Sequence, residues 1–242
     1  MKPLIGITTF DEMKDGIKGM YSIVHKRYAD SVILAGGIPV LIPLNENIDG
    51  IKELVNRLDG IILTGGNEYI QPHLYGRNST REITEINPIR DLVELEVLKE
   101  AYEQNKTVLG ICRGMQLINT FFKGDLYLNV YNEVENVECH MANSTQKYYL
   151  YHDVNLVKNS YLEKILNKDK IGVNTFHTQA VRNLGKDLKI SAISNDKIIE
   201  AIEHKNNNIF AVQWHPEALT EKYNDHLEIF KFFVKRCGAN EN

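Results

Sequence analysis

The sequence predicts an α/β fold in three layers, with a mostly parallel sheet covered by helices on both faces. Short β-branched or leucine-rich runs alternate along the chain with amphipathic segments of helix length. This alternation is typical of strands joined by crossover helices. No linker, repeat or low-complexity tract divides the 242 residues, so we expect a single domain spanning residues 1–242.

The first half of the chain alternates between strand and helix patterns. Strands are expected at residues 4–8, 38–44, 60–64 and 107–111, and helices at residues 21–37, 48–58 and 89–105. Gly36 and Gly37 close the first helix, and Asn87 followed by Pro88 caps and starts the third. Residues 65–87 carry no periodic stripe, so we expect a long loop there, a kind of segment that often carries function.

The second half is richer in strand patterns. Strands are expected at residues 148–157, 187–194, 198–204 and 209–214, before a final amphipathic helix from about residue 221 to residue 237.

Composition narrows the classes of function. A formal net charge of −4, with no basic stripe or tail, argues against nucleic acid as a partner. The apolar stretch near the start is too short for a signal-peptide core, and no segment approaches the roughly 18 apolar residues of a membrane span. We therefore expect a cytoplasmic protein without a membrane partner. Its three cysteines, Cys112, Cys139 and Cys237, are widely spaced, so reduced thiols are expected.

Cys112 lies where a strand pattern passes directly into a helix pattern, in the segment GICRG. Glycines two residues before and two residues after it permit a tight turn, which is the arrangement of a nucleophile elbow. The N-terminus of the following helix would favour the thiolate over the thiol. The other interpretation of this short motif is a small buried cysteine at a strand end.

A thiol nucleophile needs a base, and the base needs an orienting group. The segment FAVQWHPE runs from a strand pattern into His215, with Glu217 two residues further on. Neighbouring parallel strands would bring the ends of this strand and of the strand before Cys112 together. Taken alone, a histidine at a strand end is more often a surface or core residue, and a glutamate such as Glu217 is most often an exposed acid.

Gly65 and Gly66 end the strand pattern at residues 60–64. Their backbone N–H groups, unhindered by side chains, are of the kind that holds the oxyanion of a tetrahedral intermediate. Paired glycines are also common in ordinary turns.

Together these segments resemble the class I glutamine amidotransferase superfamily. Within it, they resemble the branch of γ-glutamyl hydrolases typified by γ-glutamyl-γ-aminobutyrate hydrolase, which is also grouped as a cysteine peptidase family, C26. The resemblance covers nearly the whole chain, through PLIGIT, AGGIPVLIPL, DGIILTGGNEYIQPHLYG, GICRGMQLIN, VNTFHTQAV and FAVQWHPE in the family's order. It implies a three-layer, flavodoxin-like α/β fold.

The resemblance also implies roles for residues at matching positions. Cys112 would be the nucleophile, His215 the general base and then acid, and Glu217 the group that orients the imidazole. The N–H groups of Gly66 and Arg113 would form the oxyanion hole. The positions that would face the substrate are Gly65, Gln116, Asn174, His177 and Gln179. Gln116 could instead be an ordinary glutamine of the first helical turn.

The remaining histidines are expected to be mainly structural or to lie at the surface. Cys139 next to His140 hints at a metal site, but no second pair has ligand spacing, so no metal is predicted. The pair Arg90-Asp91 matches a recurrent family pair at a helix start, which capping would explain equally well. Lys123 and Leu128-Asn129 depart from the family's glycine and Gln-Asp, and we expect them to reshape the wall of the pocket.

The expected reaction follows from the thiol chemistry. Cys112 would attack the γ-carbonyl of a small γ-glutamyl amide, and water would hydrolyse the γ-glutamyl thioester to glutamate without any cofactor. Two alternatives stay open: a glutaminase subunit that delivers ammonia to a separate synthetase, and a non-catalytic binding relative. The natural amine and the oligomeric state are also left open, a homo-oligomer included.

Overall fold

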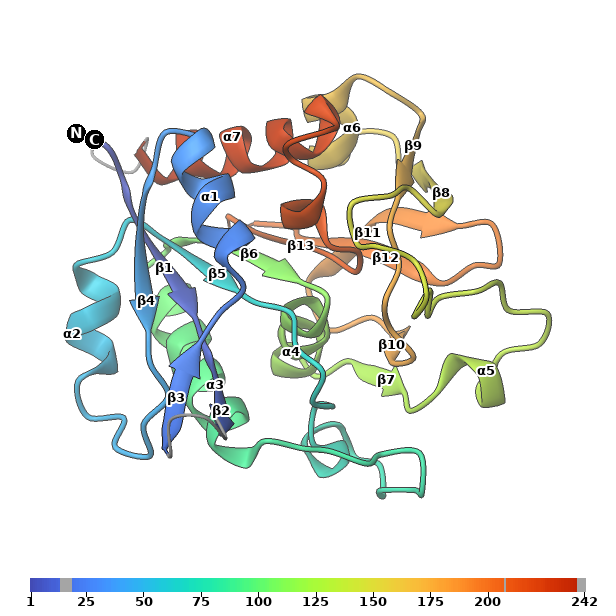
Figure 1. Ribbon diagram of the computed structural model, residues 1–242, viewed down its shortest axis with the longest axis horizontal. Coiled ribbons are helices and arrows are strands. Elements are labelled where there is room, and N and C mark those ends of the chain that lie inside the picture. Colours follow the sequence, from blue (N-terminus) through green and yellow to red (C-terminus); the bar gives the residue numbers. More distant parts are fainter. Residues whose placement is uncertain (14–18, 207, 239–242) are drawn as a thin grey trace.

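The molecule is built around a central mixed sheet with helices on both of its faces (Figure 1). Its structure, a computed structural model, describes residues 1–13, 19–206 and 208–238. The strands are β1 (Leu4–Thr8), β2 (Phe10–Met13), β3 (Met20–Ile23), β4 (Ile38–Ile42), β5 (Gly60–Leu63), β6 (Thr107–Ile111), β7 (Asp125–Tyr127), β8 (His152–Leu156), β9 (Lys170–Val173), β10 (Ala180–Asn183), β11 (Leu188–Ser194), β12 (Ile199–His204) and β13 (Ile209–Val212). The helices are α1 (Lys26–Leu34), α2 (Ile51–Asn56), α3 (Pro88–Glu103), α4 (Arg113–Phe121), α5 (Val130–Glu133), α6 (Tyr161–Leu166) and α7 (Asn224–Gly238), with 3-10 turns η1 (Pro72–Tyr75) and η2 (Pro216–Ala218).

The main sheet has the order β4-β1-β5-β6-β13-β12-β11-β8-β9. From β4 to β13 the neighbouring strands are parallel, whereas β12, β11, β8 and β9 extend the sheet antiparallel. β10 pairs with β12 and β7 beside this path. The expected α/β fold with helices on both faces is therefore confirmed, with the antiparallel extension added to its parallel part.

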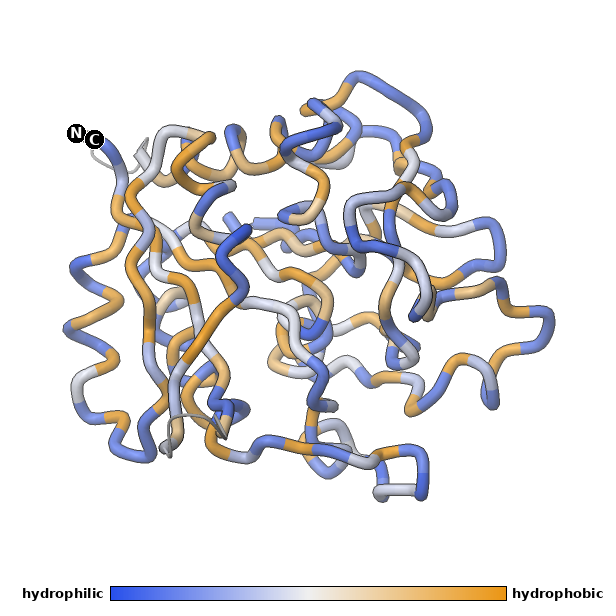
Figure 2. The backbone as a smooth tube through the Cα atoms, in the orientation of Figure 1, coloured by the Kyte–Doolittle hydropathy of each residue, from blue (hydrophilic) through white to orange (hydrophobic). Residues whose placement is uncertain are grey.

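Two hydrophobic cores lie on opposite faces of the sheet. On one face α1, α6 and α7 bury apolar side chains such as Val32 and Phe233 against the strands. On the other face α2, α3 and α4 do the same with side chains such as Val97 and Leu117. The hydropathy of the chain follows this arrangement, because strands of the sheet are largely apolar while many outer loops are hydrophilic (Figure 2). Among the described residues, no helix is both long and apolar enough to cross a membrane.

The expected helix at residues 21–37 is wrong in its first turns. Met20–Ile23 is a strand, β3, that pairs antiparallel with β2 in a separate two-stranded sheet. The helix begins only after His25, whose side chain accepts a hydrogen bond from the Arg27 N–H and so caps it. Pairing with β2, a tertiary contact that periodicity does not encode, decides the conformation of these residues. The expected close of the helix holds, since Gly36 has φ +94°.

The cap and first turn of α3 are confirmed. Asn87 accepts a hydrogen bond at its side chain from the Arg90 N–H, and Pro88 is the first helical residue. The expected loop at residues 65–87 contains the short turn η1 and one bridge to its own end, between Tyr69 and Ile86. The sequence pattern does not predict β7, β9, β10, α5 or α6, which are all short.

α4 packs unusually close to the ends of β5 and β6. A side chain at Gly114 would place its Cβ 2.2 Å from the carbonyl oxygen of Leu63, and one at Gly110 would lie 2.6 Å from Ile118 Cδ1. The first contact is with backbone, which has little room to move. The two glycines that flank Cys112 are therefore required by the packing of helix on strand.

We predict that Gly114→Ala lowers the free energy of unfolding by about 1–3 kcal/mol or more, as overpacking of a close contact does. The matched control is Gly238→Ala, because a Cβ at this exposed helical position meets nothing within 4 Å. Chemical denaturation of both variants checks the prediction. Equal stability of the two variants would show that α4 can move away from β5 at no cost.

Candidate active site

Cys112 occupies the junction between β6 and α4. Its backbone has φ 53° and ψ −105°, a conformation that is rare for residues other than glycine. The Cys112 N–H still donates to Val212 O of β13 at 2.8 Å, and its carbonyl accepts from the N–H groups of Met115 and Gln116 in the first turn of α4. The residue thus belongs to the sheet on one side and to the helix on the other, as a nucleophile elbow requires.

His215 and Glu217 follow β13, the parallel neighbour of β6. Ile111 pairs with Val212, so the chain leaves both strands at the same edge of the sheet. His215 Nδ1 lies 2.8 Å from Glu217 Oε1, and both residues are 5% exposed. Pro216 opens the 3-10 turn that joins them, which gives the pair its short, stiff connection.

The charges around His215 favour its protonated form. Burial alone would lower the pKa of His215, but the neighbouring Glu217 and Cys112 outweigh it and raise that pKa to about 9. Burial works against ionisation of Glu217 too, yet the adjacent imidazole keeps the pKa of Glu217 below its ordinary value. The arrangement therefore holds an imidazolium between the Glu217 carboxylate and the Cys112 sulfur.

Gly65 is the point on which these side chains converge. A Cβ there would lie 2.7 Å from His215 Cε1, 3.1 Å from the Tyr28 hydroxyl and 3.4 Å from Cys112 Cβ. The Gly65 N–H donates to the Tyr28 hydroxyl at 2.9 Å. Tyr28, a buried residue of α1 that no sequence motif singles out, is thus in contact with the candidate site. No sequence motif around Cys112 or His215 indicates Tyr28, because Tyr28 belongs to α1, a distant part of the sequence.

A buried ion network supports the two glycines after β5. Arg90 is fully buried and donates to the carbonyl oxygens of Thr64 and Gly65 at 3.0 and 2.9 Å. A Cβ at Gly66 would lie 2.1 Å from Arg90 Nη1. Arg90 also pairs with the carboxylates of Glu68 and Glu94. This side chain therefore fixes the turn that carries Gly65 and Gly66, and its role is more than capping.

The Arg113 side chain enters the same network. It pairs with Asp91 and Glu94, and it donates to the carbonyl oxygen of Glu68 at 3.2 Å. All of these groups lie within the first turns of α3 and α4 or in the loop between β5 and α3. The sequence pattern singles out the pair Arg90-Asp91 at the start of α3. Only the fold shows that these two residues form ion pairs with Glu68, Glu94 and Arg113.

Four residues expected to contact substrate are buried and form hydrogen bonds within the chain: Gln116, Asn174, His177 and Gln179. Gln116 donates to Gln179 O at 2.9 Å and to Gln213 Oε1 at 3.2 Å. Gln179 donates from its amide to the Tyr75 hydroxyl at 2.8 Å and accepts from the Ile70 N–H at 3.3 Å, so it anchors the long loop. Their assignment to substrate contact, like that of Gly65, stays a prediction.

Asn174 forms two hydrogen bonds with the backbone of His215. Its side-chain oxygen accepts from the His215 N–H at 2.8 Å, and its amide donates to the His215 carbonyl at 3.0 Å. His177, by contrast, faces away from these groups: its Nδ1 lies 3.0 Å from Gln179 O, and its Nε2 lies 3.6 Å from a Glu200 oxygen. The segment that joins β9 and β10 therefore contacts His215 at one point and a separate cluster at another.

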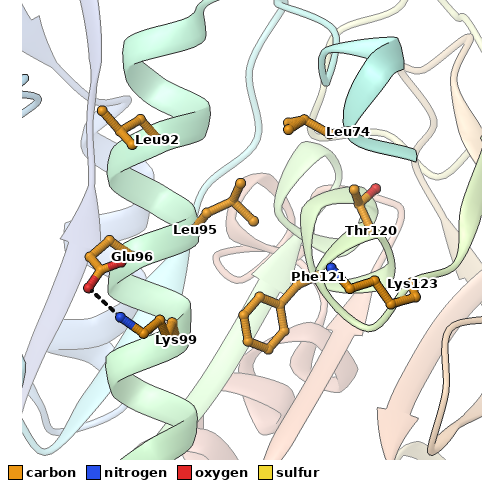
Figure 3. Close-up of a pocket in the computed structure, with 8 residues that line it drawn as sticks. All are labelled: Leu74, Leu92, Leu95, Glu96, Lys99, Thr120, Phe121 and Lys123. Atoms are coloured by element: carbon orange, nitrogen blue, oxygen red, sulfur yellow. Dashed lines mark hydrogen bonds and ion pairs between the residues drawn. The ribbon is translucent and has the colours of Figure 1, made fainter. Parts of the chain in front are cut away.

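A surface pocket lies between α3, α4 and η1 (Figure 3). It is lined by Leu74, Leu92, Leu95, Glu96, Lys99, Thr120, Phe121 and Lys123. Lys123 follows the C-terminal end of α4, whereas Cys112 precedes its N-terminal end. At about 1.5 Å per helical residue, the nine residues of α4 between them span about 13 Å.

The three departures from the family pattern have structural roles in the chain. Lys123 has φ 69°, the left-handed region in which glycine is unstrained. Leu128 is buried in the core on the α4 face, and the side chain of Asn129 caps α5 by accepting from the Tyr131 N–H. Their effect on the pocket wall stays a prediction.

Comparison with known proteins agrees with this architecture. A glutamine amidotransferase-like protein of Rickettsia prowazekii is 36% identical, over 97% of both chains. The γ-glutamyl-γ-aminobutyrate hydrolase of Escherichia coli K12 is 29% identical, over 97% of this chain and 93% of that protein. The crystal structure of a GMP synthase protein from Thermoplasma acidophilum shares the fold, with a TM-score of 0.67 at 20% identity, over 98% of this chain and 96% of that one. The family model of Peptidase C26 matches residues 3–217, and the chain belongs to that family.

Proposed function

We propose that the chain is a cysteine-dependent hydrolase of γ-glutamyl amides that acts as a single domain in the cytoplasm. The observation that carries the proposal is the position of Cys112. It lies at the start of α4 with a positive φ, beside the buried pair of His215 and Glu217. A cysteine, an imidazole and a carboxylate in this order are the parts of a thiol acyl-transfer site.

In the first step, the Cys112 thiolate forms a bond to the γ-carbonyl carbon of the substrate, and an electron pair moves to the carbonyl oxygen. The N–H groups of Gly66 and Arg113 stabilise this oxyanion. The Gly65 N–H is engaged by Tyr28, which leaves Gly66 as the donor from this turn. One such donor is typically worth about 3 kcal/mol of the barrier.

In the second step, the imidazolium of His215 gives its proton to the departing nitrogen. The carbon–nitrogen bond breaks, the amine leaves, and a γ-glutamyl thioester stays on Cys112. Water then attacks the thioester while His215 takes up a proton, which releases glutamate and restores the thiolate. Glu217 orients the imidazole and stabilises its charge through both halves. These steps need no cofactor.

The substrate class follows from the family and from the loop between β5 and α3. A protein 29% identical over nearly the whole chain is a γ-glutamyl-γ-aminobutyrate hydrolase, so a γ-glutamyl amine is the substrate we propose. The loop is tied to the segment between β9 and β10 by Gln179 and by the Tyr69 and Thr178 hydroxyls, which lie 3.0 Å apart. It can thus form a stable wall for a leaving group larger than ammonia.

The raised pKa of His215 gives a testable dependence on pH. Because Glu217 is the largest of the groups that favour the charged imidazole, Glu217→Gln should lower the pKa of His215 from about 9 toward its ordinary value of about 6.5. A histidine NMR titration, assigned with His215→Ala, measures this shift, and kcat/KM of the unaltered protein should fall as the pH rises through about 9. The control Glu221→Gln, at an exposed acid, should leave the titration unchanged. A pKa of His215 that is the same with and without Glu217 would remove this carboxylate from the mechanism.

A second test compares substrates. The pure chain should release glutamate from γ-glutamyl-γ-aminobutyrate, or a similar γ-glutamyl amine, with a higher kcat/KM than from glutamine, and without ATP, metal or partner. Cys112→Ala serves as the blank and should be inactive on both. Activity on glutamine alone, or only after a synthetase is added, would instead favour an ammonia-delivering role. Activity of folded Cys112→Ala equal to that of the unaltered chain would contradict the thiol mechanism.

A further inference from the structure

Three histidines and one glutamate gather beside the candidate active site without taking part in the proposed reaction. We name His140, His152, His177 and Glu200 the histidine–glutamate cluster. His140 follows α5, His152 begins β8, His177 lies between β9 and β10, and Glu200 belongs to β12. His140 and Glu200 are fully buried, and His177 is 4% exposed. Four segments that are distant in the sequence thus bring these side chains together inside the protein, and three of them, His140, His152 and Glu200, hold ligand atoms close to one another.

The inward-facing atoms of this cluster make no regular hydrogen bond among the described residues, although His140 Nδ1 and His177 Nε2 lie within ion-pair distance of a Glu200 oxygen. They are His140 Nδ1, both ring nitrogens of His152, His177 Nε2 and both carboxylate oxygens of Glu200. One ligand atom each from His140, His152 and Glu200 lies within 4.8 Å of the other two. Buried polar atoms are nearly always satisfied, so a group of convergent unsatisfied ligand atoms calls for an occupant.

The outward-facing nitrogens determine which form the rings take. His140 Nε2 lies 2.9 Å from a carboxylate oxygen of Asp196, and His177 Nδ1 lies 3.0 Å from the carbonyl oxygen of Gln179. Both partners can only accept, so each of these nitrogens carries its proton. In a neutral imidazole the other nitrogen then presents a lone pair, and both lone pairs face the Glu200 carboxylate. A nitrogen lone pair directed at a carboxylate is repelled by its negative charge unless a cation lies between them.

The spacing fits a metal ion. His140 Nδ1 and His177 Nε2 lie 3.3 and 3.6 Å from the same oxygen of Glu200. Two ligand atoms, each about 2.0–2.1 Å from a tetrahedral Zn²⁺, lie about 3.4 Å apart. The contacts of His140 with Asp196 and of His177 with a backbone carbonyl are those by which proteins orient metal-binding histidines.

We propose that the histidine–glutamate cluster binds a divalent transition-metal ion, with His140, His152 and Glu200 as ligands, Asp196 as the group that orients His140, and His177 paired with Glu200 beside them. Imidazole and carboxylate together suit Zn²⁺ and its first-row neighbours. The ion would tie β8 to β12. His177, which pairs with Glu200, would connect this site to the loop that carries Asn174 and hence to the backbone of His215. Its role is positioning, because none of its ligands is among the groups that react.

The competing occupant is a proton. Burial lowers the pKa of His140, but Glu200 outweighs it and raises that pKa to about 9, so an imidazolium could neutralise the carboxylate without a metal. The two occupants differ in a measurable way, since only one of them is an ion that can be counted, removed and replaced.

The test uses the full chain without a histidine tag. A background with Cys112→Ala and Cys139→Ser removes the other groups able to hold zinc, which are the active-site thiol and the exposed thiol next to His140. This protein should bind one Zn²⁺ per chain in a competition titration with a chromophoric chelator, and Zn²⁺ should raise its melting temperature. Bound Co²⁺ should give the visible spectrum of a site with nitrogen and oxygen ligands and no thiolate band.

Variants in the same background decide the assignment. Glu200→Gln and Asp196→Asn should each weaken Zn²⁺ binding by roughly tenfold or more, whereas His73→Ala, at an exposed histidine of η1, should not change it. Asp196→Asn keeps the test decisive if Glu200→Gln does not fold. No Zn²⁺ bound to the folded background protein, or equal affinity in all of the variants that fold, would overturn the proposal.

Discussion

The close packing of α4 against the ends of β5 and β6 is the constraint on which the candidate site depends. Because Gly114 sits against the carbonyl of Leu63, the chain must leave β6 and enter the helix within one residue. Cys112 takes up that change of direction in a left-handed conformation, at a cost on the order of 1–3 kcal/mol. Burial of Met115, Leu117 and Ile118 offsets this cost. The strained backbone then places Cys112, which is buried, beside Gly65 in the turn after β5.

The other walls of the site are held by interactions that start from the same helix. Arg113, its first residue, joins Arg90 in a network with Glu68, Asp91 and Glu94, and this network fixes the turn of Gly65 and Gly66. Removing one member would leave an uncompensated buried charge, which typically costs about 3–5 kcal/mol. Gln116, one turn further, holds the segment between β9 and β10. One helix N-terminus therefore positions the thiol, one flank of the site and the loop behind it.

The parallel part of the fold could be predicted because its strands and helices follow local periodicity. The elbow was also predictable, since both glycines and Cys112 lie within one five-residue segment, GICRG. The start of α1 was not, because Met20–Ile23 is decided by its pairing with β2. The contact of Tyr28 with Gly65 could not be predicted for the same reason, because the Tyr28 hydroxyl comes from α1, which is distant from Gly65 in the sequence.

The histidine–glutamate cluster shows the same limit most clearly. Spacing along the chain argued against a metal site, because His140, His152, His177 and Glu200 lie on four separate segments. Only the antiparallel extension of the sheet brings them together, by pairing β8 with β9 and β12 with β10. Spacing along the chain can find groups that one turn or helix supplies, but it does not find a cluster that the topology of the sheet assembles.

The covalent intermediate is the most direct test of the proposed mechanism. The protein is mixed with a γ-glutamyl amine, quenched in acid within the first turnover, and digested for peptide mass spectrometry. The mechanism predicts a γ-glutamyl group on the peptide that contains Cys112, absent from the Cys112→Ala protein and lost on mild alkaline hydrolysis, as a thioester is. Turnover of the substrate with Cys112 unmodified at every quench time, together with undiminished turnover by Cys112→Ala, would contradict it.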